Sequence, residues 1–136
     1  MNDWQFRHGI YAGVWDLLHP GHLFALRYAM ARCDRLTVAI NIDPTVDNPK
    51  KQKPIETVEE REKRLHACKY VDSAIAYTGE KELEALYQTG KYDVAFISIE
   101  HQLNWTNTHT AEPIFVPKFS CYSSTRLRDR IVNAKI

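Results

Sequence analysis

The sequence predicts a single α/β domain over residues 1–136, with a five-stranded parallel sheet flanked by helices. Short apolar runs recur along the chain, segments of helical pattern separate most of them, and capping residues or glycines mark several boundaries. Short apolar strands that alternate with helices are typical of a parallel sheet with crossover connections. A chain of 136 residues with 44% hydrophobic side chains has the size and composition of one domain with a substantial core.

The apolar runs are the predicted strands, and they are short enough to be buried strands of such a sheet. The runs are 6–12, 36–42, 74–77, 94–99 and 114–116.

The helices are predicted from capping residues and apolar stripes. Pro20 suits the first turn of a helix and is followed by a stripe that includes Leu23 and Leu26. Thr57 and Glu60 form a capping box before a second helix over 61–70.

Two further helices are expected in the second half of the chain. The pattern over 80–88 is helical, and Gly90 is placed to end that helix. Ser123 or Ser124 can cap a last helix over 125–133. Ligands of open parallel sheets lie beyond the carboxyl ends of the strands, so the loops that begin after these ends are expected to converge on one site.

Charge and cysteine content exclude several classes of protein. The formal net charge is +1, so the chain lacks the broad basic surface of a nucleic-acid binder. The cysteines Cys33, Cys68 and Cys121 are widely spaced and odd in number, which favours reduced thiols in a cytoplasmic protein. No segment has the length and apolar character of a membrane span or a signal peptide, so we expect a soluble protein with no membrane partner.

The most informative segment is YAGVWDLLHPGH at residues 11–22, which joins the first strand to the first helix. His19 and His22 lie three residues apart, on one face of the helix start. Unpaired N–H groups and the positive end of the helix dipole favour an anion there, and two imidazoles that donate hydrogen bonds add to this field. Gly13 is expected to let a phosphate approach the main chain. A shared metal ion and a purely structural pair are the alternatives, although no third ligand with a recognisable spacing follows.

The segment resembles the HxGH signature of the nucleotidyltransferase superfamily. Residues 13–22 look most like its cytidylyltransferase branch, whose pattern is Gly-Thr-Phe-Asp-x-x-His-x-Gly-His, and the glycerol-3-phosphate cytidylyltransferases are the most similar members. The resemblance implies a Rossmann-like domain, a homodimer and Mg²⁺ as cofactor. It also implies that His19 and His22 stabilise the transition state as a phosphoryl oxygen attacks the α-phosphate of a nucleoside triphosphate.

The same signature implies nucleotide binding by Gly13, Val14, Trp15, Asp16 and Gly21. Val14 stands where the family has threonine, so a hydroxyl is lost. Trp15 replaces phenylalanine and keeps an aromatic wall. Asp16 is expected to orient the turn or a lysine, because an attacking phosphate is already anionic and needs no general base.

A polar loop over 43–56 carries a cluster of lysines and resembles the family's Lys-x-Lys segment. Lys51 and Lys53 are the catalytic candidates in this loop, and Arg61 on the helix that follows is expected to bind the nucleotide. Flexible point charges of this kind suit a loop that closes over phosphates. The alternative is an ordinary solvated basic loop.

The segment 117–128 resembles the family's second signature, Arg-x-x-Gly-Ile-Ser-Thr-Thr followed by a helix. Hydroxyls and free amides at a helix start can hold phosphates, so Ser123, Ser124 and Thr125 are expected to bind the nucleotide. An ordinary serine N-cap is the alternative. Cys121 and Tyr122 stand where the family has glycine and isoleucine.

Three residues are expected to bind the substrate. Lys118 stands at the family arginine and keeps the charge without the bidentate fork. Glu100 follows the fourth predicted strand, where the family has an acidic turn, and Arg126 belongs to the last helix.

The predicted activity is transfer of CMP from CTP to a small phosphorylated alcohol, with glycerol 3-phosphate as the default acceptor and pyrophosphate as the second product. Two alternatives stay open at this point. One is an ATP-dependent adenylyltransferase of the same superfamily, and the other is a nucleotide-binding protein that has lost catalysis.

Overall fold

The computed structural model of the chain describes residues 7–105, 111–119 and 124–133. Its sheet contains five parallel strands in the order β3-β2-β1-β4-β5. The strands are β1 (His8–Gly13), β2 (Arg35–Asn41), β3 (Ser73–Tyr77), β4 (Val94–Ser98) and β5 (Glu112–Val116). The predicted fold class and the five strands are confirmed, and β1 extends one residue further than predicted, to Gly13.

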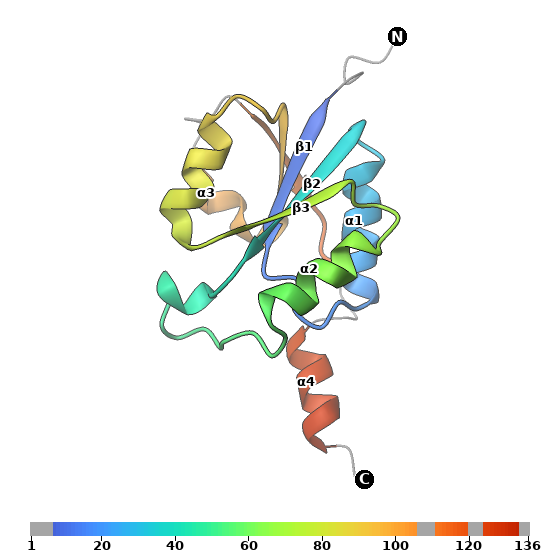
Figure 1. Cartoon of the computed structure of the whole chain (residues 1–136), viewed down its shortest axis with the longest axis vertical. Helices are drawn as coiled ribbons and strands as arrows, with labels where there is room; N and C mark the ends of the chain where they lie inside the picture. Colours follow the sequence, from blue (N-terminus) through green and yellow to red (C-terminus); the bar gives the residue numbers. More distant parts are fainter. Residues whose placement is uncertain (1–6, 106–110, 120–123, 134–136) are drawn as a thin grey trace.

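The helices cover both faces of the sheet (Figure 1). They are α1 (Pro20–Met30), α2 (Val58–His66), α3 (Gly79–Gln88) and α4 (Ser124–Asn133), with two short 3₁₀ helices, η1 (Pro44–Val46) and η2 (Ile99–Asn104). Figure 1 shows α1 and α2 on one side of the sheet, α3 on the other, and α4 at the edge where β1 ends.

The core has two parts, one on each face of the sheet, because successive side chains of a strand point to opposite faces. In β1, Tyr11 packs in the cluster that includes Leu26 of α1 and Leu65 of α2, whereas Ile10 packs in the cluster that includes Leu83 of α3. Successive strand side chains point to opposite faces, so a strand covered on both sides must be apolar at nearly every position.

Helix α2 begins three residues earlier and ends four residues earlier than the predicted range of 61–70. Its capping box is present, because the Thr57 hydroxyl accepts from the backbone N–H of Glu60 and the Glu60 carboxylate accepts from that of Thr57. However, the helix ends at His66 rather than at residue 70. Tyr70 instead packs against the core from a turn that leads into β3, so tertiary packing ends the helix early.

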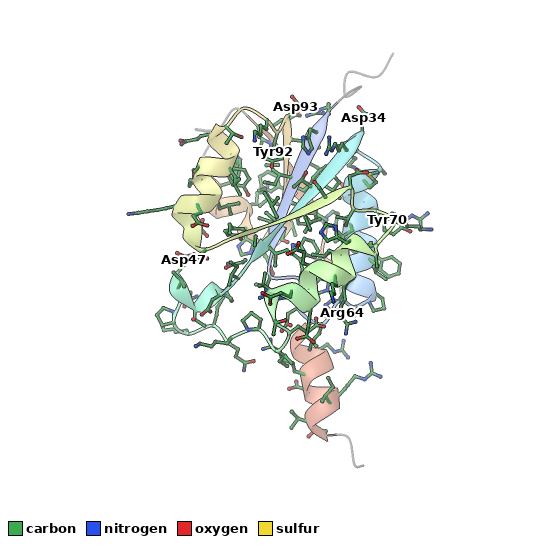
Figure 2. The ribbon with its side chains drawn as sticks, in the orientation of Figure 1. Asp34, Asp47, Arg64, Tyr70, Tyr92 and Asp93 are labelled. Atoms are coloured by element: carbon green, nitrogen blue, oxygen red, sulfur yellow. The ribbon has the colours of Figure 1, made fainter. Side chains whose placement is uncertain are left out.

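Aspartates organise the edge of the sheet where the strands begin. Asp34 accepts a hydrogen bond from the backbone N–H of Arg7 and Asp93 from that of His8, each at 2.8 Å. Figure 2 shows both labelled aspartates together at this edge, far from α4. The amino ends of the strands are therefore occupied by structural contacts, which leaves the opposite edge for ligands.

No helix of the described residues is both long and apolar enough to cross a membrane.

Candidate active site

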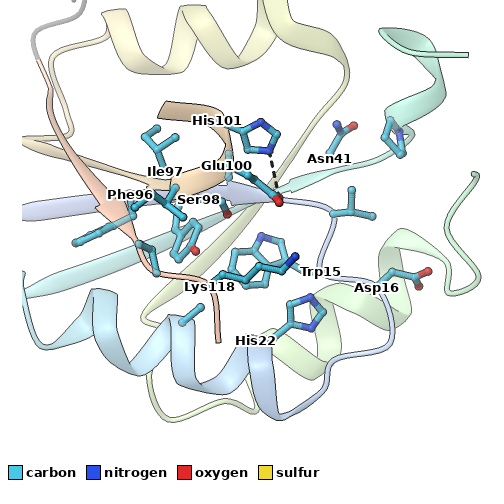
Figure 3. Close-up of a pocket in the computed structure, with 18 of the residues that line it drawn as sticks. Trp15, Asp16, His22, Asn41, Phe96, Ile97, Ser98, Glu100, His101 and Lys118 are labelled. Atoms are coloured by element: carbon cyan, nitrogen blue, oxygen red, sulfur yellow. Dashed lines mark ion pairs between the residues drawn. The ribbon is translucent and has the colours of Figure 1, made fainter. Parts of the chain in front are cut away.

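A cleft of about 920 Å³ opens at the carboxyl edge of the sheet. The last residue of every strand lines it: Gly13, Asn41, Tyr77, Ser98 and Val116. The start of α1, α3 and η2 contribute further walls (Figure 3), and the lysine loop and Arg128 of α4 also line the cleft. The cleft is therefore at the position predicted for a ligand of an open parallel sheet.

The turn between β1 and α1 has an unusual backbone. Trp15 has φ +57° and Leu17 has φ +49°, in the left-handed region that bulky residues rarely adopt. Such conformations persist only where surrounding contacts hold them, and they are concentrated at functional sites.

Two carboxylates provide these contacts. Asp16, 2% exposed, accepts from the backbone N–H groups of Ile55 (2.8 Å) and Glu56 (2.9 Å). Glu56 in turn accepts from the N–H of Leu17 at 2.7 Å. The turn and the end of the lysine loop thus each provide a carboxylate that accepts hydrogen bonds from the backbone of the other segment. These bonds give the predicted orienting role of Asp16 a structural basis.

The pKa of Asp16 reflects this environment. Burial alone raises the pKa of the carboxyl, but the hydrogen bonds from Ile55, Glu56 and Arg128 outweigh burial and hold the pKa below its ordinary value. Asp16 is therefore ionised at neutral pH and acts as an acceptor.

The two histidines cap α1. Nδ1 of His19 accepts from the N–H of Gly21 at 3.1 Å, and Nδ1 of His22 accepts from the N–H of His19 at 3.2 Å. Their rings stack with centroids 3.8 Å apart. An imidazole that accepts at Nδ1 carries its proton on Nε2, so each ring is a hydrogen-bond donor at Nε2.

Both imidazoles are neutral at neutral pH. Burial lowers the pKa of His19, and burial together with the neighbouring His19 lowers the pKa of His22 to about 3, with Asp16 opposing the shift. The pair therefore adds no positive charge to the cleft, and it lies beside the positive end of the α1 dipole.

Gly13 packs closely against the side chain of Trp15. A Cβ on Gly13 would lie 3.0 Å from Nε1 of Trp15 and 3.1 Å from Cε2 of the same ring. Glycine at this position makes room for the Trp15 indole, which folds back over the main chain. Approach of a phosphate to Gly13 stays a prediction.

Arg61 lies outside the cleft lining. It is 2% exposed and does not line the cleft, and its guanidinium donates hydrogen bonds to main-chain carbonyl oxygens. The acceptors are the carbonyls of Val14 (3.0 Å), Asn41 (2.7 Å), Ile42 (2.9 Å) and Thr57 (3.3 Å). This geometry corrects the expectation of direct nucleotide contact, because the guanidinium instead ties the ends of β1 and β2 to the start of α2.

The lysine loop divides between the cleft and solvent. Lys51 and Lys53 are both exposed, and of the two only Lys51 also lines the cleft. The backbone carbonyl of Lys53 accepts from Arg128 at 3.4 Å, so α4 contacts this loop. The catalytic role predicted for both lysines stays a prediction, and Lys53 would need a loop movement to reach the cleft.

The remaining predicted residues are distributed as follows. Val14, Trp15 and Gly21 line the cleft, as do Lys118 and Glu100. Glu100 pairs with the neighbouring His101 at 3.7 Å, the dashed contact in Figure 3.

The C-terminal signature is only partly described. Ser123 lies outside the described residues, and of Ser124 and Thr125 the structure describes only the backbone, which begins α4. Arg126 is exposed and is absent from the cleft lining.

The described residues contain no group of three or more histidine, cysteine, aspartate or glutamate side chains that could hold a metal ion.

A sequence model of the cytidylyltransferase-like family matches residues 10–130. The chain belongs to this family. The match includes the histidine turn, the lysine loop and most of α4. Membership agrees with the predicted superfamily, while special closeness to the glycerol-3-phosphate enzymes stays a prediction.

The chain is also similar to two proteins named bifunctional protein HldE. It is 36% identical to that of Gluconacetobacter diazotrophicus over 81 residues, which is 59% of this chain and 17% of the relative. For the protein of Hyphomonas neptunium, identity is 37% over 79 residues, 57% of this chain and 16% of the relative. The chain therefore spans about a sixth of the length of these relatives.

Solved structures show the same fold. The lipopolysaccharide core biosynthesis protein from Thermoplasma volcanium superposes with a TM-score of 0.68 at 22% identity, covering 84% of this chain and 98% of the other. A pantothenate synthetase from Thermus thermophilus gives 0.51 at 16% identity, covering 91% and 64%. At these identities the likeness concerns the fold.

From the sequence of this cytidylyltransferase-like chain, Arg126 was predicted to bind the substrate, and Arg128 was not. The structure places Arg128 at the cleft, where its guanidinium pairs with Asp16 at 2.5 Å and also donates to the side-chain oxygen of Gln52. Both arginines lie on α4, and their spacing did not reveal which one faces the histidine turn. Arg128 is the cation that joins α4, the lysine loop and the turn.

The neutral state of His22 predicts a pH-dependent stability. The unfolded chain binds a proton at His22 below about pH 6.5, whereas in the folded protein the pKa of His22 is about 3. The contribution of neutral His22 to the free energy of unfolding is therefore complete well above pH 6.5 and is lost as the pH falls below it. Between pH 7 and pH 5 the loss from His22 should be about 2 kcal/mol.

In the His22→Asn variant, the amide oxygen can replace Nδ1 as acceptor. Between pH 7 and pH 5 the free energy of unfolding of this variant should fall by about 2 kcal/mol less than that of wild type. Urea unfolding at both pH values measures the difference. His66→Asn, at an exposed histidine of α2, serves as control. An equal pH dependence in wild type and His22→Asn would contradict the neutral state of His22.

Proposed function

We propose that this protein is a nucleotidyltransferase that transfers CMP from CTP to the phosphate of a small phosphorylated alcohol and releases pyrophosphate. The observation that carries the proposal is the pair of stacked, neutral imidazoles at the start of α1, inside the cleft. Membership of the cytidylyltransferase-like family supports the reaction class. Glycerol 3-phosphate is the first acceptor to test.

The charges around the cleft favour one position for the triphosphate. The first turns of α1 and α4 carry no acidic residue, whereas the first turn of α3 carries Glu80 and Glu82. Helix starts attract phosphates, but carboxylates in the same turn oppose that attraction. The triphosphate therefore fits the side of α1 and α4, where Lys51, Lys118 and Arg128 also line the cleft.

The reaction needs alignment and charge neutralisation rather than covalent chemistry by the protein. An oxygen of the acceptor phosphate attacks the α-phosphorus of CTP. The bond from this phosphorus to the bridging oxygen breaks, and pyrophosphate leaves with the electron pair. In this proposal, Nε2–H groups of His19 and His22 donate to the oxygens that gain charge, and Lys51 and Arg128, which line the cleft, neutralise the β- and γ-phosphates.

Mg²⁺ enters this proposal as part of the nucleotide substrate. Magnesium usually keeps several waters and is held by one or two carboxylates together with substrate phosphates. We therefore assign the ion to the triphosphate, which it accompanies into the cleft. The homodimer stays a prediction.

The experiment measures pyrophosphate release with Mg²⁺, each of the four nucleoside triphosphates, and glycerol 3-phosphate present or absent. We expect release that requires CTP and glycerol 3-phosphate together. Turnover with a different nucleotide, or with another phosphorylated alcohol alone, would replace the assigned substrate and keep the reaction class. Nucleotide binding without turnover for a panel of phosphorylated alcohols would contradict the enzymatic proposal and favour a binding protein.

A further inference from the structure

The indole of Trp15 occupies a central position beside the histidine turn. Its ring is 5% exposed and contacts Tyr11 edge to face, with centroids 4.9 Å apart, and lies 5.4 Å from the ring of His22. Figure 3 shows Trp15 in the middle of the cleft, with His22 beside it and Lys118 among the neighbouring lining residues.

The conformation that places this ring is unfavourable on local grounds. Trp15 has φ +57°, where a side chain as large as indole is rarely found. The ring also packs closely over Gly13, where a Cβ would lie 3.0 Å from the indole nitrogen and would force the ring to shift. A strained backbone and a close contact with Gly13 thus accompany the position of one polar atom, Nε1, in the cleft.

Nε1 of Trp15 is buried and has no hydrogen-bond partner among the described residues. Buried indole N–H groups usually have an acceptor. Within the same turn, the N–H groups of Leu17, His19 and Gly21 are all paired. The indole N–H of Trp15 therefore lacks an acceptor within a turn whose backbone N–H groups are otherwise hydrogen-bonded.

We propose that the indole N–H of Trp15 donates a hydrogen bond to a phosphate oxygen of the bound substrate. This inference rests on the proposed function. An indole N–H only donates, so its partner must be an acceptor, and the neighbouring helix start, imidazoles and lysine all favour an anionic oxygen. Phenylalanine, which the cytidylyltransferase pattern has at this position, cannot make this bond.

The residue before Trp15 also differs from the family pattern, and this difference explains why an indole N–H would be useful here. The family pattern has threonine there, and valine lacks the hydroxyl that could donate to a phosphate. Trp15 restores one donor to the turn from the next position. Because Nε1 is covered, the proposed bond requires the rings packed around it to move when substrate binds, and His22 is one of these rings.

The first experiment follows the indole N–H signals of the ¹⁵N-labelled full chain by NMR. The chain has three tryptophans, and the signal of Trp15 is assigned as the one lost in Trp15→Phe. CMP, Mg²⁺–CTP, pyrophosphate and glycerol 3-phosphate are added separately. We expect the Trp15 indole proton to move downfield and to exchange more slowly with water in at least one arm.

The arms identify the source of the oxygen. A response to CMP and CTP assigns the α-phosphate, a response to pyrophosphate alone assigns the leaving group, and a response to glycerol 3-phosphate alone assigns the acceptor. If the backbone amides of residues 19–22 respond to CTP while the Trp15 indole responds to nothing, this inference is wrong and the proposed function stands. If no signal responds to any compound, both are wrong.

Substitution provides a second measurement. Trp15→Phe should raise the Kd of the responding compound about tenfold, as expected for a lost hydrogen bond to a charged group. Tyr92→Phe is the control, because it removes a polar atom from another buried aromatic ring, outside the cleft. Equal affinities for wild type and Trp15→Phe would overturn the inference.

Discussion

Replacing His19 with asparagine is expected to lower kcat by about 100- to 1,000-fold, while the fold and the affinity for nucleotide change little. Asparagine is among the best N-cap residues, and its amide oxygen can accept from the N–H of Gly21 as Nδ1 of His19 does. The variant therefore keeps the cap of α1 and removes the donor at Nε2, which the proposed mechanism aims at the charge that develops in the transition state.

His19→Gln is the matched comparison. Its longer side chain can place an amide N–H near the position of Nε2, but it fits the cap less well. We expect His19→Gln to retain more activity than His19→Asn and to be less stable. The measurements are kcat from pyrophosphate release, Kd for CTP by calorimetry, and urea unfolding. Wild-type kcat in a folded His19→Asn variant would show that this imidazole is only a helix cap.

Replacing Arg61 with alanine is expected to lower the free energy of unfolding by about 3–5 kcal/mol. The guanidinium is buried, and its removal leaves the carbonyls of Val14, Asn41 and Ile42 without their donor. Buried acceptors that lose their partners keep the cost of desolvation. Arg61→Lys should be intermediate, because a single ammonium cannot reproduce the planar fork.

Urea unfolding of the three proteins measures this effect. Lys63→Ala, an exposed position on the same helix, controls for loss of a basic side chain from α2 and should change stability by about 0.5 kcal/mol or less. A fully stable Arg61→Ala variant with weak nucleotide binding would return Arg61 to the role that the sequence suggested.

Local patterns were sufficient for most of the fold. The apolar runs predicted all five strands to within about two residues where the structure describes them, because a strand buried on both faces is recognisable from its own composition. The capping box at Thr57 and the end of α3 before Gly90, whose φ is +77°, were equally local features. The end of α2 was predicted wrongly, because Tyr70 is held by core packing and not by helical periodicity.

For the candidate site, the sequence by itself determined where the chemistry should lie. The spacing of His19 and His22 and their place after an apolar strand are properties of one short segment, and family membership followed from it and from the later segments. The contacts of Arg61, Arg128 and Trp15 were shown only by the tertiary structure. Arg61 meets Val14 across 47 residues and Arg128 meets Asp16 across 112, and no periodicity shows which cation comes to be buried against which oxygen. Burial and partners decide whether a charged or polar group serves the fold or the ligand, and both depend on contacts between distant segments.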